Sequence, residues 1–98
     1  FEVYWSMATK NLIGPAVRRE RCARGLSQQA MAARCNLLGW ALSRATLSKI
    51  ESRLRRVNDA ELWLLAAALG AEIAELFPAG SRRKPPPTFI AVARHSED

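Results

Sequence analysis

The residues best suited to chemistry lie in one short stretch, between Ser43 and Arg53. If this stretch is a helix that continues to Leu54, one of its sides carries Ser43, Leu47, Ile50 and Leu54 and is mostly apolar. The opposite side is small and basic: Ala45, Ser48, Lys49 and Ser52, flanked by Arg44 and Arg53. Small side chains let a helix enter the major groove of DNA, and Arg44 and Lys49 can reach guanine O6 and N7. The stretch therefore predicts a DNA-reading helix; a solvated basic helix face is the alternative.

The other reactive side chains do not group into a catalytic or metal site. The single histidine, His95, and the two cysteines, Cys22 and Cys35, fit neither a zinc-ligand spacing nor a nucleophile beside a base. There is no phosphate-binding glycine loop, and acidic residues share a face only within residues 57–79. We therefore expect no enzyme, no metal and no cofactor, with both thiols free and mostly buried in a reducing cytosol.

Charge is distributed unevenly along the chain. The formal net charge of the 98 residues is +6. Residues 10–56 hold eleven Lys and Arg against Glu20 and Glu51, a balance of +9, whereas residues 57–79 hold four acidic residues and no base. One side of the molecule is thus expected to face a polyanion. The length allows one small domain and excludes a large multi-domain enzyme, and the longest apolar run, residues 62–71, is too short to span a membrane.

The residues that break or start helices predict an all-α domain. Gly14 and Pro15 precede a first helix over residues 16–24, and Gly25 follows as its stop. Three later starts place a polar N-cap between two apolar residues, at Ser27, Ser43 and Asn58. The further helices are expected from Ser27 to about residue 35, from Ser43 to residue 52 or 53, over residues 59–69, and from about residue 72 to Pro78.

The apolar positions of these helices recur at helical spacing and predict one core. Its expected members are Val17, Met31, Leu47, Ile50, Leu62, Leu65, Ala66, Leu69, Ile73, Leu76 and Phe77, with Trp63 at the margin. Outside this domain, residues 1–10 are expected to form a flexible segment. Residues 79–98 are expected to form a basic, proline-rich tail, with strand character at residues 88–92.

Three segments of the chain follow a known pattern in order. They are Leu-Ser-Gln at 26–28 with Ala32, Ser-Arg-Ala-Thr-Leu-Ser-Lys-Ile-Glu at 43–51, and the apolar positions Leu64, Leu65, Ala68, Leu69, Ile73, Leu76 and Phe77 around Gly70. Over residues 11–78 the chain resembles the helix-turn-helix domain of the Cro and phage-repressor class, the XRE family. The resemblance implies a five-helix, lambda-repressor-like fold, with the second helix over the DNA backbone and the third in the major groove.

The resemblance also implies roles for individual residues. Base contacts are expected from Arg44, Ala45 and Lys49. Backbone contacts are expected from Gln28, Ser43, Thr46, Arg53, Arg55 and Arg56, with Ser43 and Thr46 also near thymine. Gln28 would in addition steady the third helix, and Glu51 would have a structural role.

Two features depart from the family pattern. The turn between the second and third helices is longer, with the excess at residues 36–41. Leu37, Leu38 and Trp40 could lengthen the second helix and attach the insert to the core, or the insert could tilt the third helix. The Asn-Gly pair that commonly follows the family glutamate is Ser52-Arg53 here, which predicts an extra helical turn carrying Arg53 toward phosphate.

The leading hypothesis is a bacterial or phage transcription regulator that binds double-stranded DNA sequence-specifically as a homodimer. It would work in the cytoplasm, associated with the nucleoid. The alternative is a protein-interaction module, such as an antitoxin-like partner, that uses Trp40, Trp63 and residues 88–92. A third hypothesis is nonspecific or RNA binding through the basic tail, although the stacked aromatic residues typical of single-strand binding are missing from the tail.

Overall fold

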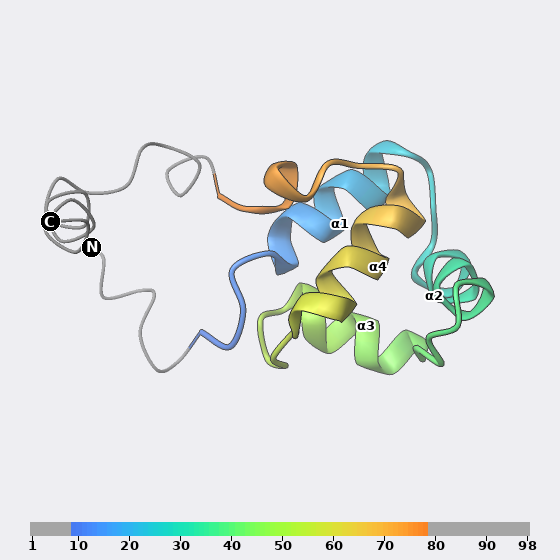
Figure 1. Cartoon of the computed structure of the whole chain (residues 1–98), viewed down its shortest axis with the longest axis horizontal. Coiled ribbons are helices and arrows are strands. Elements are labelled where there is room, and N and C mark those ends of the chain that lie inside the picture. Colours follow the sequence, from blue (N-terminus) through green and yellow to red (C-terminus); the bar gives the residue numbers. More distant parts are fainter. Residues whose placement is uncertain (1–8, 79–98) are drawn as a thin grey trace, which may run out of the picture.

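Four α-helices and one turn of 3-10 helix make up the part of the chain that the computed structural model describes, residues 9–78 (Figure 1). They are α1 (Gly14–Ala23), α2 (Gln28–Leu37), α3 (Arg44–Glu51), α4 (Asp59–Leu69) and η2 (Ile73–Leu76). These residues contain no strand, so the all-α prediction is confirmed, while the expected fifth helix is only the four-residue η2. The expected tail at 79–98, its strand at 88–92 and most of segment 1–10 lie outside the described residues.

The three expected N-caps all make their side-chain hydrogen bonds. Ser27 Oγ accepts from the Ala30 amide at 3.0 Å, and Ser43 Oγ accepts from the Thr46 amide at 3.0 Å. Asn58 and Glu61 form a reciprocal capping box at the start of α4. Each bond satisfies an amide that has no partner within its own helix, which is why these starts could be predicted from sequence.

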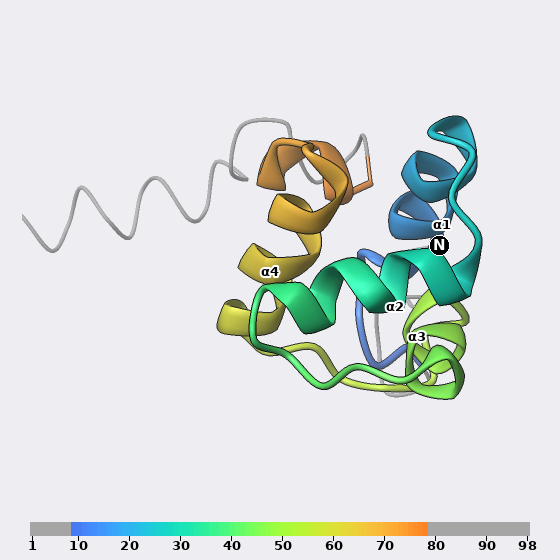
Figure 2. The same ribbon diagram turned by 90° about the vertical axis from the view of Figure 1, so that its right-hand side faces the viewer.

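The helices surround one core. α3 packs against α1 and α2, and α4 packs against α1, α2 and η2; Figure 2 shows α2 running across the domain from α4 to α3. The predicted core residues that are buried are Val17, Met31, Leu47, Ile50, Leu65, Ala66, Leu69 and Leu76, and Leu62 and Phe77 pack partly buried against them. Ile13, Ala16, Cys35, Leu42 and Ala68 also belong to the core.

Four apolar or thiol side chains lie further out than predicted. Ile73 is exposed because the single turn of η2 directs only Leu76 inward. Leu54 is 67% exposed because α3 ends at Glu51, so the helical spacing that placed Leu54 on the apolar side no longer applies. Trp63 is 61% exposed rather than at the core margin, and the Cys22 thiol is exposed.

The insert between α2 and α3 lengthens α2 and leaves α3 packed on its neighbours. α2 continues to Leu37, and Trp40 and Leu42 pack into the core from the connection that follows. Asn36 Nδ2 donates to the Leu42 carbonyl at 3.0 Å, joining the end of α2 to the end of the insert. Leu37, by contrast, points to solvent and is 88% exposed. The attachment predicted for the insert is therefore made by Trp40, whereas Leu37 and Leu38 are both exposed.

The end of α3 differs from the sequence prediction. The helix stops at Glu51 without an extra turn, and Arg53 takes the left-handed conformation with φ of 64°. The Arg53 amide donates to the Ile50 carbonyl at 3.0 Å, and the Leu54 amide donates to the Lys49 carbonyl at 2.8 Å. This pair of bonds is the Schellman ending that glycine usually provides. Arginine thus occupies a glycine-type helix end without changing its geometry.

Candidate nucleic-acid interface

The exposed face of α3 carries the predicted base-contacting residues together. Arg44, Ala45 and Lys49 are exposed, while Leu47 and Ile50 on the opposite face are fully buried. Among residues 9–78, the side chains of Arg44 and Lys49 have no hydrogen-bond or ion-pair partner. Two long cations therefore extend from a helix whose other side is fixed in the core. Such side chains can bind the acceptor atoms of an approaching polyanion.

The first turn of α3 is held by hydroxyl groups. Ser43 Oγ donates to Thr46 Oγ1 at 3.0 Å in addition to capping the Thr46 amide. Both side chains remain at least partly accessible. Ser43 and Thr46, predicted as backbone contacts, thus stand beside Arg44 at the start of the helix.

An open hollow joins the starts of α2 and α3 to α1. It is lined by Arg18, Arg21, Ser27, Gln28, Gln29 and Arg44. The N-terminus of α2 adds partial positive charge, so the hollow combines two exposed cations, amide side chains and a helix start suited to a phosphate group. Arg18 and Gln29 were not singled out from the sequence. Gln29 directly follows the predicted contact Gln28, a signal that was present in the sequence, whereas Arg18 reaches the hollow only because α1 packs against α3.

A buried polar network fixes the far end of α3. Arg21 Nε and Nη2 donate to the two oxygens of the Glu51 carboxylate at 2.7 and 3.1 Å, and both side chains are nearly buried. Arg21 Nη1 also donates to the Leu26 carbonyl at 2.7 Å, and Gln28 Nε2 donates to Glu51 Oε1 at 3.0 Å. The hydrogen bonds to Glu51 raise the pKa of Arg21. The network joins α1, α2 and α3, which accords with the structural role expected of Glu51.

Gln28 has its predicted steadying position, since its side-chain amide bonds to Glu51. Gln28 also lines the hollow beside Arg44. Gln28 can therefore hold α3 through its bond to Glu51 and still border a phosphate that enters the hollow. The phosphate contact itself stays a prediction.

A second attachment joins the start of α1 to the end of α3. Asn11 Oδ1 accepts from the Gly14 amide at 2.8 Å, and Asn11 Nδ2 donates to the carbonyls of Ile50 at 3.1 Å and Arg55 at 2.7 Å. Gly14 lies so close to α3 that an added Cβ would overlap the Ile50 carbonyl oxygen. Sequence reasoning treated Gly14 as a helix start and did not single out Asn11, because this contact spans 39 residues.

The three arginines after α3 occupy different environments. Arg55 forms a two-pronged ion pair with Glu61, at 3.0 and 3.1 Å, and this pair raises the pKa of Arg55 and lowers that of Glu61. Arg56 is exposed, and Arg53 is partly exposed on its left-handed backbone. A phosphate would compete with Glu61 for Arg55, so Arg56 is the better placed of these two for the predicted backbone contact.

The comparisons with known proteins agree with this architecture. A family model described as helix-turn-helix matches residues 17–76. The chain belongs to this family, of the Cro and phage-repressor type. An HTH_3 family transcriptional regulator from Vibrio cholerae has a similar solved structure, with 30% sequence identity and a TM-score of 0.61. The match covers 74% of this chain and 38% of that regulator. No curated protein matches the chain.

Residues 9–78 contain neither a candidate membrane span nor a candidate metal-binding cluster. No helix there is both long enough and apolar enough to cross a membrane. The same residues contain no group of three or more histidine, cysteine, aspartate or glutamate side chains that could hold a metal ion.

Proposed function

We propose that this protein binds double-stranded DNA sequence-specifically, placing α3 in the major groove, and that it regulates transcription. The observation that carries the proposal is the pair of unpartnered cations, Arg44 and Lys49, on the exposed face of a helix fixed at its far end. Family membership and the similarity to the Vibrio cholerae transcriptional regulator support the same function. Membership of a family that includes transcriptional regulators also supports a non-enzymatic role for this protein.

In this proposal, different residues contact the bases and the DNA backbone. Arg44, Lys49 and the small Ala45 would contact base edges. The backbone would be held by Gln28, Ser43, Thr46, Arg53 and Arg56, joined by Arg18 and Gln29 from the hollow beside α2. Arg55 would contribute only by giving up part of its pair with Glu61.

We further propose that the protein acts as a homodimer in the cytoplasm, at the nucleoid, where it occludes or recruits polymerase. The dimer is proposed because helix-turn-helix proteins commonly bind DNA as dimers, with two units reading two half-sites one helical turn apart. Selection of bound duplexes from a random pool tests this arrangement. A recovered palindrome supports both specificity and two-fold symmetry, whereas a pool that never becomes enriched contradicts sequence-specific binding.

The reading role of α3 is tested by titrating variants against the selected duplex and a random duplex at the same salt concentration. Arg44→Ala should cost roughly 1 to 3 kcal/mol on the selected duplex and less on the random one, because base contacts carry discrimination. Arg56→Ala is the control and should weaken both duplexes alike, because phosphate contacts do not depend on sequence. Equal losses on both duplexes for Arg44→Ala would contradict a reading role for α3.

A further inference from the structure

The outer face of α4 is apolar although it faces solvent. From Leu62 to Leu69 the helix contains only apolar residues, so both its core side and its outer side are hydrophobic. Trp63 is 61% exposed at the middle of the outer side, with Ala60 and Ala67 exposed one turn away on either side. A helix that is hydrophobic all round is normally covered on all sides. Within residues 9–78 nothing covers Trp63.

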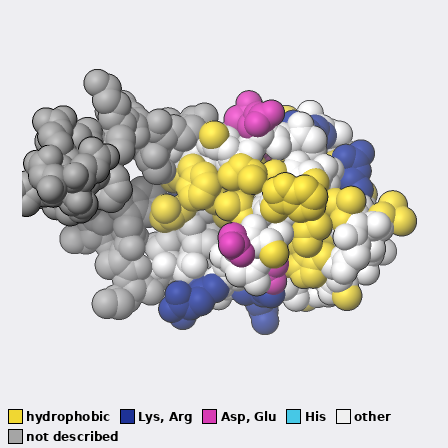
Figure 3. Space-filling view, viewed as in Figure 1, with side chains coloured by type: hydrophobic (Ala, Val, Ile, Leu, Met, Phe, Trp, Pro, Cys, Tyr) yellow, Lys and Arg dark blue, Asp and Glu magenta, His cyan; other side chains and the backbone are white. Residues whose placement is uncertain are grey.

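The apolar surface continues past the end of α4. Ile73 and Ala74 of η2 are also exposed, and Figure 3 shows hydrophobic side chains in a band across the face that α4 and η2 present. We name this band, Ala60, Trp63, Ala67, Ile73 and Ala74, the α4 face. Contiguous apolar surface of this kind marks interaction sites more often than a single exposed residue does.

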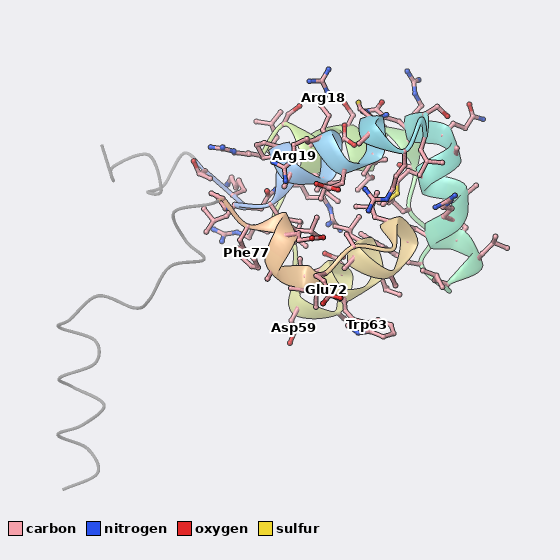
Figure 4. The ribbon with its side chains drawn as sticks, turned by 90° about the horizontal axis from the view of Figure 1, so that it is seen from above. Arg18, Arg19, Asp59, Trp63, Glu72 and Phe77 are labelled. Carbon is pink, nitrogen blue, oxygen red and sulfur yellow. The ribbon has the colours of Figure 1, made fainter. Side chains whose placement is uncertain are left out.

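The edges of the α4 face are acidic. Asp59 and Glu72 are exposed near Trp63, and Figure 4 shows them with Trp63 on one side of the molecule. No lysine or arginine occurs in residues 57–79. Glu61 is already paired with Arg55, whereas Asp59 has no partner among the described residues. The face therefore complements a surface that is apolar at its centre and basic at its edges.

The α4 face lies away from the basic hollow of the DNA-binding surface proposed above. Figure 4 places Arg18 on the side of the molecule opposite Trp63 and Asp59, and Arg18 lines the hollow shared with Gln28 and Arg44. A partner on the α4 face would thus leave the basic hollow accessible. The two surfaces also differ in charge, so a polyanion bound by one is repelled by the other.

The acidic edges of the α4 face favour a different protein over a second copy of this chain as its partner. In a two-fold interface the same patch meets itself. The acidic edges of both copies would then approach each other without a cation on the face to balance them. We infer that the α4 face docks another protein through an amphipathic segment, with apolar side chains seated against Trp63 and lysine or arginine beside Asp59 and Glu72.

A synthetic amphipathic helix tests the inference. It carries leucines on one face and lysines along both edges, and a second peptide carries glutamates in place of the lysines. Calorimetric titration of the full chain should detect saturable binding of the lysine peptide and none of the glutamate peptide. Trp63→Ala should weaken that binding roughly tenfold or more, because a central aromatic residue dominates such interfaces. The charge-reversed double variant Asp59→Lys, Glu72→Lys should weaken it similarly.

Leu54→Ala is the matched control, since Leu54 is as exposed as Trp63 but follows α3 rather than lying on α4. It should bind the lysine peptide as the unmodified chain does, and Trp63→Ala should keep the unmodified helical circular dichroism and DNA affinity. No saturable binding of the lysine peptide, or equal binding by Trp63→Ala, would overturn the inference. So would a dimer in sedimentation that Trp63→Ala converts to monomer, because a second copy would then be the occupant. DNA titration is read separately, so failure here leaves the proposed function in place.

Discussion

The two ends of α3 are held in different ways. Its C-terminal end is fixed by buried polar groups from three other parts of the chain, through Glu51 with Arg21 and Gln28 and through Asn11 at the Ile50 carbonyl. Its N-terminal end has a local cap at Ser43, and Arg44 beside it has no partner in residues 9–78. A reading helix needs a fixed direction and free side chains. α3 has the fixed direction at its C-terminal end, and its free cations, Arg44 and Lys49, lie on its exposed face in the first and last turns.

The strongest test of this contrast removes the buried carboxylate. Glu51→Ala should lower the free energy of unfolding by about 3 to 5 kcal/mol, because it leaves the Arg21 guanidinium buried without its partner. Urea denaturation followed by circular dichroism measures the change. The double variant Arg21→Met, Glu51→Leu is the control and should be much less destabilised, since no charge is left buried. A loss below about 1 kcal/mol for Glu51→Ala would mean that the network does not fix this end.

Gly14→Ala tests the other attachment of the same end. The added methyl group would overlap the Ile50 carbonyl, so α1 and α3 would have to separate. A loss of about 2 to 3 kcal/mol in unfolding free energy, measured by the same urea denaturation, is expected.

Gly25→Ala is the control for Gly14→Ala. Gly25 has φ of +68° and no atom within 4 Å of an added Cβ, so only left-handed strain is introduced, about 1 kcal/mol. If the two alanine variants lose equal stability, the close approach of α1 to α3 is not what Gly14 provides.

Arg53 is expected both to strain the end of α3 and to contact the DNA backbone, and Arg53→Gly separates these two effects. Glycine relieves the left-handed strain at φ of 64°, so unfolding should cost about 0.5 to 1 kcal/mol more than in the unmodified chain. DNA affinity should fall on all duplexes, because a cation after α3 is lost. Arg53→Ala keeps the strain and loses the cation, and should lower DNA affinity without gaining stability. Unchanged affinity in both variants would exclude Arg53 from the interface.

The partly exposed pair Arg55–Glu61 is expected to contribute less to stability than the buried pair Arg21–Glu51 does. The pKa of Glu61 is lowered from its ordinary value of 4.5, first by hydrogen bonds from Arg55. Its contribution to stability is therefore present above pH 4.5 and lost as the pH falls through the lowered pKa. Because Arg55 is about one-third exposed, solvent screening limits this contribution to about 1 kcal/mol or less.

Glu61→Gln measures that contribution while keeping a side chain that can cap Asn58. The stability difference between Glu61→Gln and the unmodified chain should shrink as the pH falls from about 5 to 3. Thermal melts across this range give the difference, and Arg55→Gln with Glu61→Gln completes a double-mutant cycle. A difference that is constant with pH would show that the charge on Glu61 adds nothing.

Local patterns predicted most of the helices. The caps at Ser27, Ser43 and Asn58 were readable because each satisfies an amide only three residues away. Leu47 and Ile50 were assigned to the core because helical spacing places them on one face. The same reasoning was wrong for Leu54 and Ile73, because it assumed that a regular helix continues through residues that lie beyond α3 or within a single 3-10 turn.

The sequence by itself determined the helix-turn-helix class, the basic α3 face with Arg44 and Lys49, and the separation of charge along the chain. Only the tertiary structure decided which arginines are engaged. Arg21 is buried against Glu51, Arg55 is paired with Glu61, and Arg18 joins the hollow beside Arg44. It also decided that Trp40 packs inward and Trp63 outward. The physical reason is range: caps and periodicity act within a few residues, whereas ion pairs and burial depend on groups that only folding brings together.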